Sequence, residues 1–123
     1  MTWFGVSVIV SIRLKRGKQA KIPVFENIIL VEAKTPKEAA KKAAKKAKAE
    51  AKIDDGLTLN DKPAYYSFDG IRKVVNVSNP VHLDLDKHRP VSGTEISYSE
   101  FVVSPADIKK LVAGKELKIL YVG

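Results

Sequence analysis

The 123-residue sequence contains no cysteine and only two histidines. The absence of cysteine excludes a disulfide-stabilised fold, a catalytic thiol and every zinc site that uses thiolate ligands. No apolar run is long enough to cross a membrane as a helix. The apolar residues 3–14 are followed, rather than preceded, by positive charge, which is the reverse of a secretory signal. We therefore expect a cytoplasmic protein that does not bind membranes.

Motifs of the common enzyme classes are also missing from the sequence. It has no glycine-rich phosphate loop, no G-x-S-x-G nucleophile elbow, no H-E-x-x-H zinc motif and no protein-kinase set. We therefore expect a protein that is not an enzyme and holds no cofactor. An enzyme whose site is assembled from scattered residues stays open as an alternative. The composition, 45% hydrophobic and 29% charged, is typical of a globular chain, and the length predicts a single domain over residues 1–123.

Strict alternation over residues 3–14 predicts the first strand. The even-numbered positions from Phe4 to Leu14 are all apolar, which is the pattern of a strand with one buried face. A basic loop over residues 15–21 then leads to a second strand at about residues 22–34. Its predicted core positions are Phe25, Ile29, Val31 and Ala33, with Asn27 as the polar exception.

The segment Thr35-Pro36-Lys37-Glu38 predicts a helix start. Threonine accepts free backbone N–H groups, proline suits the first turn, and glutamate completes a capping box. The helix should extend to about Lys52, with its alanines on one face and its lysines on the other. An alanine face allows a helix to lie close on a sheet.

The remaining segments complete an α+β pattern. We predict a loop over 57–63, followed by a strand over 65–77 with a bulge at Gly70. An extended segment over 78–93 should lead to another strand over 94–103. A short helix from Ser104, with Ile108, Leu111 and Val112 inward, and a final strand over 115–122 should complete the chain. The predicted fold is a mainly antiparallel sheet of about five strands, with one long Ala/Lys helix on a face and one short C-terminal helix.

Three stretches resemble an uncharacterised bacterial family, the domain-of-unknown-function 4288 family. They are Trp3-Phe4-Gly5-Val6-Ser7-Val8, then Glu26 to Ala33 continuing into the alanine-rich helix, then Phe68-Asp69-Gly70-Ile71 with Gly93-Thr94-Glu95-Ile96-Ser97-Tyr98. The resemblance covers roughly residues 1–103 and implies a small α+β domain with no assigned activity. The helix is more basic than is usual in this family, and residues 104–123 look like an addition.

Positive charge is concentrated in the first part of the chain. Residues 1–52 carry a net charge of +9 and residues 53–123 a net charge of −1. We expect the basic loop and the helix to be neighbours and to form a surface for a polyanionic or acidic partner. A merely solvated helix face is the alternative. The predicted partner-binding residues are Arg13, Lys15, Arg16, Lys18, Lys37, Lys41, Lys45, Lys48 and Lys52.

Two further groups of polar residues were considered as sites. His82, Asp84, Asp86 and His88 share one side of an extended chain, but at ~3.3 Å per residue all four span too far to bind one ion, so we predict no metal site. Glu26 and Asn27, next to the predicted core of the second strand, would form a buried polar pair.

The sequence therefore predicts a binding module with an acidic protein as partner, which it docks on or neutralises in the manner of an immunity protein. The alternative is weak, non-specific binding of nucleic acid, in which Tyr65, Tyr66 and Phe68 would stack on bases unless they belong to the core. Only four arginines are present, which disfavours specific base recognition. Nothing in the sequence indicates an oligomeric state.

Overall fold

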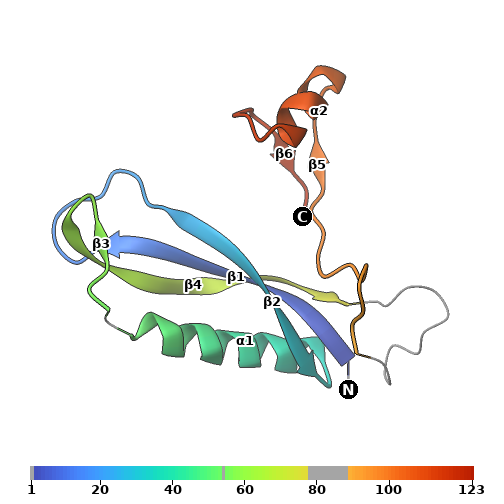
Figure 1. Cartoon of the computed structure of the whole chain (residues 1–123), viewed down its shortest axis with the longest axis horizontal. Coiled ribbons are helices and arrows are strands. Elements are labelled where there is room, and N and C mark those ends of the chain that lie inside the picture. The colour runs from blue at the N-terminus through green and yellow to red at the C-terminus, as the bar shows by residue number, and fades with distance from the viewer. Residues whose placement is uncertain (1, 54, 78–88) are drawn as a thin grey trace.

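The computed structural model describes residues 2–53, 55–77 and 89–123 (Figure 1). The fold is α+β, with a mainly antiparallel four-stranded sheet in the order β2-β1-β4-β3, a separate two-stranded sheet of β5 and β6, and two helices. The elements are β1 (Thr2–Leu14), β2 (Val24–Ala33), α1 (Pro36–Ala51), β3 (Thr58–Leu59), β4 (Lys62–Asn76), β5 (Phe101–Val102), α2 (Pro105–Val112) and β6 (Leu120–Tyr121). Neither helix of the described chain has the length and hydrophobicity needed to cross a membrane.

The first predicted strand is confirmed as β1, which lies at the centre of the sheet. Both of its edges are paired in antiparallel fashion, one with β2 and the other with β4. Its even-numbered side chains Phe4, Val6 and Val8 are buried under α1, which runs along one face of the sheet (Figure 1). Half-buried side chains of β2 and β4 complete this core.

The predicted helix start is confirmed at α1. The Oγ1 of Thr35 accepts a hydrogen bond from the backbone N–H of Glu38 at 3.1 Å, and a carboxylate oxygen of Glu38 accepts from the backbone N–H of Lys34 at 3.3 Å. The Lys42 ammonium and then the Lys34 N–H lower the pKa of Glu38. The alanine face is also confirmed, because Ala39, Ala43 and Ala47 are the buried residues of the helix.

Two register shifts interrupt the pairing of β4 with β1. Ser7 faces Lys73 and Val8 faces Ile71, so Arg72 is an extra residue; Ile9 faces Gly70 and Val10 faces Phe68, so Asp69 is another. These are β-bulges, which redirect side chains locally. Gly70 separates them and has a φ of 155°, in the region that favours glycine. The predicted irregularity at Gly70 is therefore confirmed and is larger than expected.

Residues 57–63 were predicted as a loop, and this prediction is wrong. The short strand β3 pairs with the start of β4, and the two central residues of the turn, Asn60 and Asp61, have φ angles of 52° and 63°. Positive φ at both central residues is typical of a type I′ hairpin turn, which asparagine and aspartate tolerate.

The predicted strands over 94–103 and 115–122 are mostly absent. Only β5 and β6 form there, and they pair with each other instead of joining the main sheet, which has four strands rather than five. The backbone at Ile96 instead crosses the face of the sheet against Gly5, so this segment does not lie alongside an edge strand.

The prediction of an inward face on α2 is also wrong. Ile108 is 52% exposed and Val112 is 84% exposed, and only Leu111 is half-buried. Within the described residues, α2 packs on none of the other helices or strands, and the β5–α2–β6 unit stands away from the sheet on the side opposite α1 (Figure 1). The guanidinium group of Arg72, on β4, lies 3.7 Å from the centre of the Tyr121 ring, and this cation–π contact connects the unit to β4.

The core face of β2 is shorter than predicted. Ile29, Val31 and Ala33 lie under the helix, but Phe25 is 46% exposed and Asn27 is exposed. A 16-residue helix is about 24 Å long, whereas the 13 residues of β1 extend about 43 Å, so α1 leaves the loop end of the sheet uncovered. Glu26 and Asn27 are not a buried pair either, since consecutive strand residues point to opposite faces.

Candidate functional site

Five lysines form a continuous exposed ridge along α1. At 3.6 residues per turn they fall within an arc of about 80° on the side of the helix away from the sheet. We call this set the lysine ridge: Lys37, Lys41, Lys45, Lys48 and Lys52, all of them exposed. They are also the five helix residues predicted from the sequence.

The other two lysines of α1 have local partners. The Lys42 ammonium donates to the backbone oxygen of Glu32 at 2.9 Å and lies 3.3 Å from a carboxylate oxygen of Glu38. Lys46 forms an ion pair with Glu50, one turn further along the helix. Both lysines lie on the flank of the helix next to the sheet, so they support the helix rather than extend the ridge.

The basic loop between β1 and β2 meets the end of the lysine ridge. Lys15, Arg16 and Lys18 are exposed in this loop. Lys15 and Lys52 line one depression of about 160 Å³, together with residues that follow the helix. The expectation that the loop and the helix are neighbours therefore holds at the C-terminal end of α1, whereas Lys37 lies at the opposite end.

Lys62 adds a charge that was not predicted. It lines a second hollow, of about 610 Å³, with Lys15 and Arg16. The pairing of β4 with β1 brings it there, since the backbone N–H of Lys15 donates to the oxygen of Pro63 at 3.0 Å. The only signal in the sequence was the Asn-Asp turn before it, which positions Lys62 at the start of β4.

Arg13 lies apart from the other predicted binding residues. It is an odd-numbered residue of β1, and its side chain is on the sheet face opposite α1, 3.0 Å from a carboxylate oxygen of Asp69. Its Nε donates to the Oγ of Ser11 at 3.1 Å. The hydrogen bond from Ser11, followed by those from Arg13 and Ser67, lowers the pKa of Asp69. Arg13 is therefore part of a polar network that supports the bulge at Asp69.

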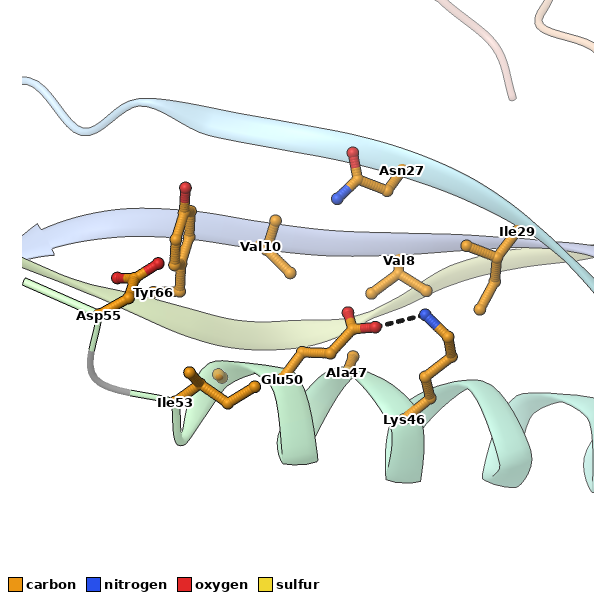
Figure 2. Close-up of a pocket in the computed structure, with 11 residues that line it drawn as sticks. Val8, Val10, Asn27, Ile29, Lys46, Ala47, Glu50, Ile53, Asp55 and Tyr66 are labelled. Atoms are coloured by element: carbon orange, nitrogen blue, oxygen red, sulfur yellow. Dashed lines mark hydrogen bonds and ion pairs between the residues drawn. The ribbon is translucent and has the colours of Figure 1, made fainter. Parts of the chain in front are cut away.

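A cavity of about 360 Å³ opens between the last turns of α1 and the sheet. Figure 2 shows Val8, Val10 and Ile29 pointing from the sheet toward the helix, with Ala47 opposite them. The small side chain of Ala47 does not fill the space that the curved end of the sheet leaves. The volume falls within the usual range of small-molecule sites.

Polar groups surround this apolar floor. The carboxylate of Glu50 points into the space between helix and sheet, and that of Asp55 lies beside the ring of Tyr66 (Figure 2). Asn27 lines the cavity from β2, and the Lys46 ammonium approaches from the helix to pair with Glu50. The cavity therefore combines two carboxylates with one ammonium, in contrast to the basic ridge on the outer side of the same helix.

The four residues considered as metal ligands, His82, Asp84, Asp86 and His88, lie outside the described residues. Over the residues that are described, no three His, Asp or Glu side chains are grouped as they would be around a metal ion.

The three aromatic residues considered for base stacking differ in exposure. Phe68 packs against the core, whereas Tyr65 and Tyr66 are 42% and 39% exposed.

Most of the chain matches a known protein family. The family model with the description "Domain of unknown function (DUF4288)" matches residues 3–96, which confirms the resemblance drawn from the sequence. The match begins beside Gly5 and ends at Ile96, the two residues that meet on the face of the sheet, and it leaves out the β5–α2–β6 unit. No match was found among curated proteins or among solved structures.

Proposed function

We propose, from the premise that this chain belongs to the DUF4288 family, a domain of unknown function, that it is a non-enzymatic binding module for an acidic partner protein. The binding surface comprises the lysine ridge, the basic loop residues Lys15, Arg16 and Lys18, and the adjoining Lys62. Its role is to dock on or neutralise that partner in the bacterial cytoplasm, as an immunity protein does with a toxin.

The observation that carries the proposal is a difference between two groups of lysines on α1. The two on the flank of the helix form ion pairs, whereas the five on the lysine ridge are exposed along about 24 Å of helix. Among these five, the Lys48 ammonium also lies 5.7 Å from the centre of the Phe68 ring. Neighbours such as Lys41 and Lys45 are four residues apart and repel each other by a few tenths of a kcal/mol. This repulsion destabilises the free protein, and an acidic partner that neutralises the lysine charges would remove it.

A row of like charges on a rigid helix also has a kinetic effect. Complementary charge accelerates the encounter of two proteins and fixes their orientation, and the effect weakens as salt screens the charges. The charge reversal Lys41→Glu, Lys45→Glu and Lys48→Glu should therefore slow association more than it speeds dissociation.

The test compares two triple variants with equal charge change. One carries the three ridge substitutions, and the control carries Lys109→Glu, Lys115→Glu and Lys118→Glu, all exposed in the part of the chain outside the family match. Binding to poly-L-glutamate, as a model acidic polypeptide, is measured at low and physiological salt. We expect at least tenfold weaker binding for the ridge variant and a much smaller change for the control. Equal losses would show that only net charge matters and would overturn the proposal.

Nucleic acid remains a second candidate, because one observation favours it. Tyr66, which is 39% exposed, lines the same depression as Lys15 and Lys52, so an aromatic ring and two cations border one depression. Such a surface suits nucleic acid, because a base can stack on the aromatic ring while phosphates pair with the cations. Binding of an unrelated single strand and duplex is titrated at two salt concentrations. Tighter binding of the single strand than of poly-L-glutamate at the same ionic strength, reduced by Tyr66→Ala, would favour this candidate over an acidic protein.

A further inference from the structure

The cavity beneath the last turns of α1 has a charge opposite to that of the surface around it. Its walls carry the carboxylates of Glu50 and Asp55 against the single ammonium of Lys46. The helix ends here, and its last carbonyl groups add partial negative charge at the C-terminus. A chain with a net charge of +8 therefore contains a locally negative pocket.

The shape of the cavity suits a flat apolar group. It is a slot between two layers, with Val8, Val10 and Ile29 on the sheet side and Ala47 on the helix side (Figure 2). The ring of Tyr66 forms one end wall. A volume of about 360 Å³ accommodates a bicyclic ring with a short side chain.

We propose that this cavity binds a small aromatic amine, with the ring in the apolar slot and the ammonium group beside the Glu50 carboxylate. The Lys46 ammonium holds the Glu50 carboxylate in place and competes for it when the ligand binds. The Asn27 amide and the Tyr66 hydroxyl, at the rim, are available to hydrogen-bond a polar substituent. This site adjoins the depression lined by Lys15 and Lys52 and shares Ile53, Asp55 and Tyr66 with it, but its test uses variants outside the lysine ridge.

Three probes that share an indole ring and a two-carbon linker but differ in charge test the proposal: tryptamine, tryptophol and indole-3-propionate. Each is titrated into the full ¹⁵N-labelled chain, and amide chemical shifts report where and how tightly it binds. We expect tryptamine to shift the amides of Val8, Val10, Asn27 and Ala47. Its affinity should exceed that of tryptophol by about fivefold, as for a good solvent-accessible ion pair, and indole-3-propionate should bind most weakly.

Variants that are expected to change the affinity for tryptamine in opposite directions distinguish recognition of its charge from simple burial of its ring. Glu50→Gln should reduce the affinity for tryptamine to near that of tryptophol, which should itself change little, and Asp55→Asn should have a smaller effect in the same direction. Lys46→Gln removes the competing cation and should strengthen tryptamine binding. Ala47→Leu fills the slot and should weaken all three probes. Glu116→Gln, exposed and far along the chain, is the matched control and should have no effect.

The proposal fails if the three probes bind with equal affinity, if indole-3-propionate binds best, if the shifted amides lie elsewhere, or if tryptamine does not bind. None of these outcomes affects the lysine ridge, whose test uses different variants and an anionic probe. Conversely, loss of poly-L-glutamate binding in the ridge variant leaves the tryptamine titration unchanged.

Discussion

The carbonyl oxygen of Ile96 occupies the space that a side chain on Gly5 would need, 1.8 Å from the position of an ideal Cβ atom. Real Cβ atoms do not come that close to backbone oxygen, so only glycine permits this crossing. The contact joins the first strand of the domain to the last residue of the family match.

Gly5→Ala should therefore displace the segment around Ile96 and destabilise the protein by about 1–3 kcal/mol, the usual cost of overpacking. Chemical denaturation gives the free energy of unfolding, and limited proteolysis shows whether residues 89–98 become more accessible. Ser7→Ala is the control on the same strand and face, since the buried Ser7 hydroxyl has no hydrogen-bond partner among the described residues and its loss should cost little. Unchanged stability in Gly5→Ala would mean that the segment does not lie on the sheet in solution.

The two buried alanines nearest the cavity should respond differently to enlargement. Ala43 is 1% exposed within the closed core, so Ala43→Leu should cost about 1–3 kcal/mol. Ala47 is 8% exposed and borders the empty slot, which can accept part of the added volume. Ala47→Leu should therefore cost less than Ala43→Leu in a parallel urea titration. Equal costs would indicate that the slot is closed in solution.

The lysine ridge should contribute little to folding. The combined change of Lys41, Lys45 and Lys48 to glutamate leaves like charges next to one another, but it gives Lys37 and Lys52 an opposite charge four residues away, so the melting temperature should stay unchanged or rise slightly. Differential scanning calorimetry at low salt measures this. A drop in melting temperature beyond a few degrees would show that these lysines are structural and would complicate their use in binding tests.

The pH dependence of stability should reveal the network around Asp69. Its carboxylate has a lowered pKa in the folded protein, chiefly because Ser11 donates a hydrogen bond to it. The associated stability is present above the unfolded pKa, about 3.9, and is lost as the pH falls through the lower folded pKa. Asp69→Asn should thus be less stable than the wild type at pH 7, with the difference shrinking as the pH falls below about 4. Denaturation at several pH values checks this, with Glu116→Gln as the control; a difference that stays constant with pH would contradict it.

Features of the structure could be predicted from the sequence where they depend on residues close together in the chain. The alternation from Phe4 to Leu14 and the cap at Thr35 are properties of neighbouring residues, and both predictions were confirmed. The segment over 94–103 was also predicted to be a strand, but at Ile96 it crosses the face of the sheet against Gly5, and only the short pairing of β5 with β6 forms. A local pattern does not report where on the sheet a distant segment packs.

The candidate sites divide in the same way. The lysine ridge follows from helical periodicity, so all five of its members were identified. Lys62 and the cavity depend on contacts between distant segments and on the unequal lengths of α1 and β1, and no spacing in the sequence indicates them. Arg13 was grouped with the basic loop by proximity in sequence, although strand alternation directs it to the other face.

The paired bulges of β4 have a consequence for how this strand can change in length. Asp69 and Arg72 have no partner on β1, whereas Phe68, Ile71 and Val74 pair with Val10, Val8 and Val6 on the core side of the sheet. Deleting Asp69 or Arg72 would therefore leave these three pairs in place and turn the bulge into a regular ladder. Deleting a paired residue such as Ile71 would instead bring a charged side chain opposite Val8, so changes in length should be tolerated at the two bulged positions and not between them.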